Sequence, residues 1–253
     1  MKRITLLSII IIFLSGLLFL SSTNSSGATA GTARSNADQE LEQHILNATV
    51  RFMVESWIVR PDETGYDIDY TMGHGTVMNG RFLVTHNHFD VPLSILNREG
   101  DAGSYVVIYL YNSQGEPLLK VPFADFELAG QDVETLVFAH KEEGFFTNLG
   151  LSSAAFADGA AQALQPGTEV AQVDWDGTTA RVDWVTVQEV ILDEGPPRLI
   201  LADAVLPGAS GGGIFYHGVH VANNWHLHEK IDATGAVVEA VTAVALNSAI
   251  VVN

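Results

Sequence analysis

The feature of the sequence that most restricts its fold is a long series of short β-rich runs that begins at Trp57. The runs are rich in Val, Ile, Tyr, Phe and Trp, and clusters of Gly, Asn, Asp and Pro separate them. They cover residues 57–60, 75–78, 81–85, 104–111, 117–123, 135–139, 168–175, 180–192, 198–205, 212–216, 219–223 and 236–246. Because helical periodicity is almost absent here, the sequence predicts an all-β barrel or sandwich.

Turn signals and one amphipathic segment complete this prediction. Asn79-Gly80, the stretch from Asn112 to Gly115, and Asp176-Gly177 are typical hairpin turns. Before the first run, residues 37–54 have apolar side chains at roughly helical intervals, namely Leu41, Ile45, Ala48, Val50 and Met53. We therefore expect one N-terminal helix that leads into the β region.

The N-terminus has the pattern of an export signal. Lys2 and Arg3 precede an apolar stretch from Ile4 to Leu20, and a small-x-small site follows at residues 28–30. The predicted organisation is a signal peptide or membrane anchor over 1–30, a flexible linker over 31–37 and one folded domain over 38–253. The mature protein is then exported, and is secreted, periplasmic or anchored at the outer face of a membrane, with cleavage favoured over retention.

Composition excludes several functions. With 12 Lys+Arg against 30 Asp+Glu, the formal charge of -18 repels phosphates, so nucleic acid is not an expected partner. We expect contact with a membrane only through an uncleaved N-terminal anchor. The chain has no cysteine, which excludes disulfides and cysteine-ligated metals, and we predict no cofactor.

The most informative motif is the loop Asp203-Ala-Val-Leu-Pro-Gly-Ala-Ser-Gly-Gly-Gly-Ile-Phe, between two β runs. Glycines at 208, 211 and 212 allow sharp bends that present the hydroxyl of Ser210 outward. In such a turn the amides of Gly208 and Ser210 can point the same way and form an oxyanion hole. A serine among glycines is also compatible with a simple flexible turn, so the loop needs support from the rest of the chain.

PGASGGGIF resembles the PGNSGGPL loop of HtrA-type proteases and the GDSGGP loop of trypsin-like proteases. The preceding DAVL is similar to their TDAAIN, and residues 218–223 resemble their GxVxGIN strand. Gly213 stands in place of the usual proline, and Ala209 in place of the aspartate of digestive enzymes. The resemblance implies a chymotrypsin-like fold of two six-stranded β-barrels, without the PDZ domain of HtrA enzymes. Without the aspartate, no activation by a new N-terminal ammonium is expected.

The resemblance also indicates a base and an acid. Residues 73–88 are similar to the family's GSG(F/V)xxxxxGxILTNNHV hairpin, which selects His88 as the base and leaves His86 as its neighbour. Asp132 fits the family's D-x-A-x-L pattern, with Glu134 in the place of the small residue. Asp125 and Asp101 remain competitors for the acid that orients the imidazole.

A metal site is the main alternative, because His86, His88 and Asp90 form an H-x-H-x-D pattern that is similar to metallo-β-lactamase-like zinc hydrolases. That family has another histidine directly after the aspartate, whereas this chain has Val91. The metal fold also requires βα units. A third alternative is a catalytically inactive barrel protein that only binds a partner.

The sequence therefore predicts an exported serine endopeptidase of protein or peptide substrates, with His88, Asp132 and Ser210 as catalytic triad. By resemblance, Ala204, Asn223 and Trp225 line a substrate pocket that favours small or apolar side chains. The natural substrate and the oligomeric state are left open.

Overall fold

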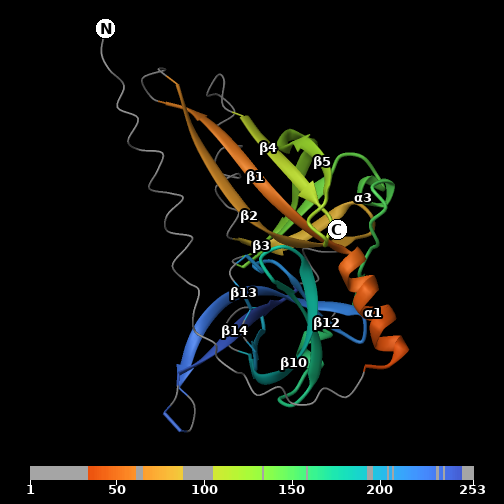
Figure 1. Ribbon diagram of the computed structural model, residues 1–253, viewed down its shortest axis with the longest axis vertical. Coiled ribbons are helices and arrows are strands. Elements are labelled where there is room, and N and C mark those ends of the chain that lie inside the picture. Colours follow the sequence, from red (N-terminus) through yellow and green to blue (C-terminus); the bar gives the residue numbers. More distant parts are fainter. Residues whose placement is uncertain are drawn as a thin grey trace. The chain divides into compact units, whose positions relative to one another are not determined.

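A computed structural model describes residues 34–60, 65–87, 105–132, 134–157, 159–192, 196–203, 205–206, 208–231, 234–235 and 237–246, without the side chains of 228–231 and 237–239. Its described part is mainly β, in two seven-stranded, largely antiparallel sheets, and Figure 1 shows them as separate groups of strands. The all-β prediction is confirmed.

The first sheet has the strand order β5-β4-β1-β2-β3-β7-β6. Its strands are β1 Thr49–Val59, β2 Tyr66–Met78, β3 Phe82–His86, β4 Tyr105–Tyr111, β5 Pro117–Pro122, β6 Phe126–Gln131 and β7 Thr135–His140. A single 3-10 turn, η2 Phe123–Asp125, connects the edge strands β5 and β6, which do not pair with each other within the described residues. This sheet is a half-barrel, whereas the sequence predicted six strands in a closed ring.

The second sheet has the order β12-β9-β10-β11-β14-β13-β8, and an additional β12–β13 pairing closes six of its strands into a barrel. Its strands are β8 Ala155–Phe156, β9 Glu169–Trp175, β10 Ala180–Ile191, β11 Arg198–Leu201, β12 Gly213–Tyr216, β13 Val219–Ile231 and β14 Val237–Ala245. β8 is a short parallel addition to β13. The second half of the double-barrel prediction is therefore confirmed with its predicted strand number.

The predicted N-terminal helix exists, but it is shorter than expected. Helix α1 covers Asn36–Asn47, and β1 begins at Thr49. In β1, Val50, Phe52 and Val54 are buried and the residues between them are partly exposed. This period of two belongs to a strand, and β-branched side chains favour it, so the sequence analysis was wrong to continue the helix to residue 54.

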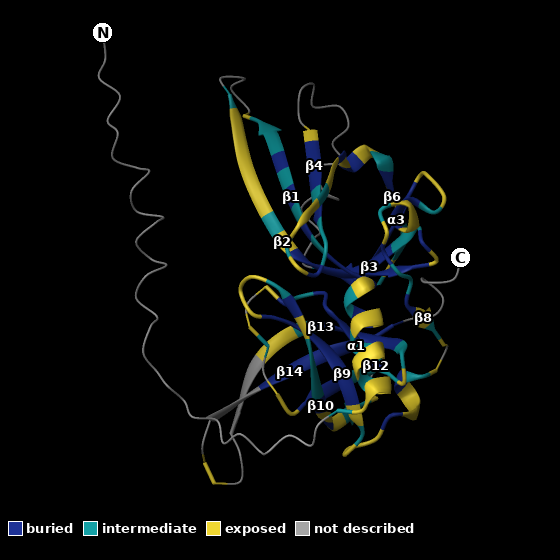
Figure 2. Cartoon of the chain, turned by 45° about the vertical axis from the view of Figure 1, so that its right-hand side comes forward, coloured by how far each residue is buried: buried dark blue, intermediate teal, exposed yellow. Residues whose placement is uncertain are grey.

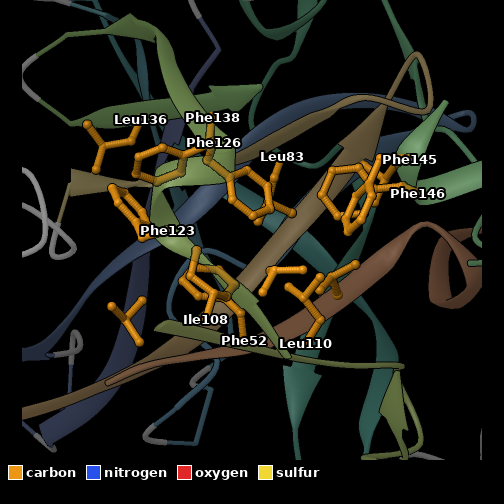
Figure 3. Close-up of a cluster of buried hydrophobic side chains, with 14 of the residues drawn as sticks. Phe52, Leu83, Ile108, Leu110, Phe123, Phe126, Leu136, Phe138, Phe145 and Phe146 are labelled. Atoms are coloured by element: carbon orange, nitrogen blue, oxygen red, sulfur yellow. The ribbon is translucent and has the colours of Figure 1, made fainter. Parts of the chain in front are cut away.

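The hydrophobic core lies mainly inside the two sheets (Figure 2). The first sheet surrounds an aromatic cluster, part of which Figure 3 shows, with Phe52, Phe123, Phe126, Phe138, Phe145 and Phe146 among its members. The short helix α3, Phe145–Asn148, contributes the last two. Helix α1 packs on the second sheet through Ile45, which contacts a cluster that includes Trp175 and Phe215. The chain thus stabilises both sheets without disulfides.

Candidate active site

The Ser210 loop connects β11 to β12 and bends sharply on both sides of the serine. Gly208 has φ +104° and Gly211 has φ +78°, which are left-handed values that favour glycine. The N–H of Gly212 donates a hydrogen bond of 2.9 Å to the carbonyl of Ala209, which closes a tight turn around Ser210. The glycines that the sequence analysis singled out are therefore the bending points of the loop.

The same loop packs directly against the first sheet. The N–H of His74, in β2, donates to the carbonyl of Ser210 at 2.8 Å, and the hydroxyl of Thr85, in β3, donates to the carbonyl of His74 at 2.7 Å. A Cβ on Gly211 would lie only 2.1 Å from the His74 carbonyl oxygen and 2.3 Å from the Thr85 hydroxyl. Only glycine fits between the Ser210 loop and the first sheet at this point.

The side chain of His74 holds the loop at a second point. Its Nδ1 lies 2.8 Å from the carbonyl oxygen of Gly208, and a carbonyl can only accept, so Nδ1 carries the proton. The ring is buried, and burial lowers the pKa of His74 to about 4. His74 is therefore neutral near pH 7 and fixes the direction of the Gly208 carbonyl. No sequence motif indicated this role for His74.

Asn224, in β13, clamps the loop from the second sheet. The carbonyl of Asn224 accepts from the N–H of Gly211 at 2.9 Å, and its own N–H donates to Gly212 at 2.8 Å. Its buried side-chain amide donates to the carbonyls of Val173, at 2.7 Å, and Ala209, at 3.3 Å. Contacts from both sheets thus hold the backbone on either side of Ser210.

Ser210 also lines a cavity of about 180 Å³ in the second barrel. The other lining residues are largely apolar and come from the loop, β13 and β14, namely Val205, Leu206, Asn224, Trp225, His226, Leu227 and Val241. Trp225 was predicted to line this pocket. The buried side chain of Asn223 is directed elsewhere, since its Oδ1 lies 3.1 Å from Nε2 of His220, and Asn224 lines the cavity instead. Ala204 lies outside the described residues.

Asp132 lies in the turn between β6 and β7, with one carboxylate oxygen engaged. Oδ1 accepts from the N–H groups of Glu134, at 2.8 Å, and Thr135, at 2.6 Å. Oδ2 is buried and has no hydrogen-bond partner within the described part of the chain. A carboxylate held in this way can accept a hydrogen bond from an imidazole through its second oxygen.

The predicted base, His88, lies outside the described residues, but the chain leading to it is well placed. His86 is the last residue of β3 and pairs with Thr135 at the start of β7. The N–H of Asn87 donates to the carbonyl of Glu134 at 3.2 Å. The described chain therefore ends one residue before His88, alongside the turn that holds Asp132.

The competing acids are placed differently. Asp125 lies in η2, at the opposite end of β6 from Asp132, and six strand residues span about 20 Å. In the register of the sheet, that end of β6 pairs with His140, whereas the Asp132 end pairs with Leu136. Only the latter end is next to His86. Asp101 lies outside the described residues.

Comparisons with solved structures give a consistent match to the fold. A variant of the HtrA-type protease AlgW, solved with a decapeptide, superposes with TM-score 0.55 over 82% of this chain at 13% identity. Deg5 superposes with TM-score 0.53 at 14% identity, and the aligned region covers 77% of this chain and 88% of the Deg5 chain. The active form of the Rv3671c protease from M. tuberculosis gives TM-score 0.51 over 87% of this chain and 85% of that chain, at 16% identity.

The chain has the chymotrypsin-like double β-barrel fold. The chain spans only part of the AlgW chain, of which the aligned region covers 62%. No protein-family model matches the sequence, and no curated protein matches it either.

Within this fold, the two departures from the loop patterns of HtrA-type and trypsin-like proteases each have a packing reason. A Cβ on Gly213 would lie 2.6 Å from the ring of Phe215 and 2.7 Å from the Thr76 hydroxyl, so no proline fits there. Ala209, in the place of the aspartate of digestive enzymes, is fully buried in an apolar cluster that includes Trp175. A carboxylate there would need a buried partner.

The chymotrypsin-like fold contradicts the metallo-β-lactamase-like alternative, which requires βα units. Among the residues that the structure describes, no group of three His, Asp or Glu side chains lies close enough together to hold a metal ion. His88 and Asp90, two of the three ligands of that alternative, fall outside them. His86 is fully buried at the end of β3, and the backbone register places it beside Thr135.

Proposed function

We propose that the protein is a serine endopeptidase that uses Ser210, His88 and Asp132 as a catalytic triad. The observation that carries the proposal is the position of Ser210, which lines a cavity of the second barrel while its loop is bonded to His74 of the first sheet. Thr85, which bonds the same His74 carbonyl, lies three residues before His88. These contacts support a triad assembled at the junction of the two barrels.

In the proposed mechanism, His88 removes the proton of Ser210 as its Oγ attacks a peptide carbonyl. The tetrahedral oxyanion is held by the N–H groups of Gly208 and Ser210, which donate to no other group within the described part of the chain. Asp132 Oδ2 accepts from the imidazole and stabilises its cation. His88 then protonates the leaving amine, the acyl-enzyme forms, and water releases the acyl group by the reverse steps.

The cavity beside Ser210 supports apolar side chains at the residue before the scissile bond. A cavity of about 180 Å³ has room for an aliphatic side chain. Leu206, Leu227 and Val241 supply apolar walls, and no carboxylate is among the lining residues that are described. We therefore propose aliphatic residues, rather than Lys or Arg, at this position of the substrate.

A fluorophosphonate probe tests the proposal, because it reacts with an activated serine. The purified protein should be labelled with or without a chelator, and Ser210→Ala should abolish labelling. Ser152→Ala is a suitable control, since only the backbone of Ser152 makes a described hydrogen bond, to Asn47. Chelator-sensitive hydrolysis without labelling would favour a metal enzyme, and neither activity would favour the inactive binding module.

Export is proposed from the N-terminal sequence alone. Residues 1–33 lie outside the described part, and within that part no helix is both long and apolar enough to cross a membrane. We propose that cleavage near Ala30 releases the domain, with retention as an anchor as the alternative. N-terminal sequencing of the mature protein distinguishes them: a start near residue 31 supports cleavage, whereas a start near Met1 in a membrane fraction supports the anchor.

A further inference from the structure

Four residues form a closed ring of contacts between the two barrels, through three side-chain contacts and one backbone hydrogen bond. The carboxylate of Glu134 accepts from the guanidinium of Arg198 in β11, at 2.6 Å from Nη2 and 3.1 Å from Nε. The guanidinium lies 5.6 Å from the centre of the Trp225 ring. Trp225 Nε1 donates to Asn87 Oδ1 at 3.3 Å, and the backbone N–H of Asn87 donates to the carbonyl of Glu134 at 3.2 Å. We call these residues the bridging ring.

The ion pair in the ring is largely withdrawn from solvent. The side chain of Glu134 is 2% exposed and that of Arg198 is 28% exposed. A carboxylate so buried requires a partner, and arginine suits the task because it offers two donors in a fixed geometry. Glu134 occupies the place of a small residue in the D-x-A-x-L pattern, so Arg198 explains this departure.

The bridging ring is next to each part of the proposed catalytic machinery, by a hydrogen bond, along the chain or across the cavity. The N–H of Glu134 holds the Oδ1 of Asp132 at 2.8 Å. Asn87 directly precedes His88 in the chain. Trp225 lines the same cavity as Ser210. Asp132 follows β6 of the first sheet, the described chain after β3 of that sheet ends one residue before His88, and Ser210 lies between strands of the second sheet. A contact that joins the sheets here therefore affects the distance between the proposed catalytic groups.

We propose that the Glu134–Arg198 pair is a positioning device, which holds Asp132 and His88 of the first barrel in register with Ser210 of the second. This inference rests on the proposed serine endopeptidase function. The pair touches neither substrate nor reacting atoms. The pair acts on Asp132 by fixing the Glu134 N–H that donates to it. It acts on the cavity beside Ser210 through Arg198, which holds the lining residue Trp225 in place. A shift of about 1 Å between catalytic groups is enough to lower a rate about 100-fold.

The test compares fluorophosphonate labelling kinetics of Arg198→Met, Arg198→Lys and Glu134→Gln with the wild type, each corrected for its folded fraction. We expect Arg198→Met to lower the maximal labelling rate about 10- to 100-fold, while the probe concentration at half-maximal rate changes less than about threefold. Lysine keeps the charge and glutamine keeps an acceptor oxygen, so Arg198→Lys and Glu134→Gln should each be labelled faster than Arg198→Met but more slowly than the wild type. Should Arg198→Met not fold, Glu134→Gln carries the test.

Arg81→Met is the matched control. The Arg81 side chain is 23% exposed and pairs with Glu127 at 2.8 Å, but it lies at the β2–β3 turn, before the start of β3, whereas His86 is at its end. This variant should be labelled at the wild-type rate.

Two outcomes separate the positioning proposal from the proposed function. If the wild type is not labelled at all, the serine endopeptidase proposal fails. If the wild type is labelled but Arg198→Met matches it after correction for folded fraction, the pair is only structural and the positioning proposal is wrong. A loss of equal size in Arg81→Met would overturn it as well.

Discussion

Replacing Gly211 with alanine tests how tightly the Ser210 loop is confined. The new Cβ would stand 2.1 Å from the His74 carbonyl oxygen, more than 1 Å short of ordinary contact at 3.4 Å, and 2.3 Å from the Thr85 hydroxyl. The φ of +78° costs alanine about 1–2 kcal/mol, and relieving the overlap adds about 1–3 kcal/mol. We expect Gly211→Ala to lower the free energy of unfolding by about 2–5 kcal/mol.

Gly177→Ala is the matched control, because Gly177 has a similar φ of +97° but no atom within 4 Å of its added Cβ. It should lose only the conformational part, about 1–2 kcal/mol. Urea unfolding measures both variants, and fluorophosphonate labelling of the folded proteins measures the active site. Gly211→Ala should label about 100-fold more slowly, since Ser210 must shift by about 1 Å. Equal stability and equal labelling of the two variants would refute the confinement of the loop.

Three further predictions concern the acid, the buried histidines and the loop clamp. Asp132→Asn should lower the labelling rate about 10⁴-fold, because the imidazole loses its orienting carboxylate, while Asp125→Asn should not change it; equal effects would contradict the assignment. Burial lowers the pKa of His74 and His220 from 6.5 to about 4, so below pH 6.5 the unfolded chain binds protons that the folded chain excludes. Stability should therefore fall by about 2 kcal/mol per histidine between about pH 7 and pH 5, as urea unfolding at both values will show. Asn224→Ala removes the donor to two buried carbonyls and should lower the free energy of unfolding by about 1–3 kcal/mol in the same assay.

The fold could be predicted from the sequence because its signals are local. Asn79-Gly80 has positive φ at both residues, as an Asn-Gly turn between β2 and β3 requires. The half of β2 without buried residues, from Tyr66 to Met72, was missed, because there the hairpin has no buried face to produce an alternating pattern. β6 was missed for a related reason, since only its first residue, Phe126, is buried.

The site was partly predictable. Ser210, Gly208 and Asp132 were predicted from short motifs; the first two lie in a loop that is hydrogen-bonded to His74 of the first sheet, and Asp132 lies in the β6–β7 turn. The long-range contacts around these residues could not be found in this way, because Gly208 lies 134 residues after its partner His74 and Arg198 lies 64 residues after its partner Glu134. No local pattern reports such contacts. For Asn223 and Asn224, a bulge after Asn224 in β13 obscures which of two adjacent amides faces the cavity.

The central claim is that His88 and Asp132 of the first barrel meet Ser210 of the second, and a crystal structure of the fluorophosphonate-treated protein tests it most directly. The account predicts a covalent bond from Ser210 Oγ to phosphorus, with the phosphonyl oxygen about 2.7–3.1 Å from the N–H groups of Gly208 and Ser210. The His88 ring should lie between the adduct and Asp132 Oδ2. An adduct on another residue, or a His88 ring directed away from Ser210, would contradict the account.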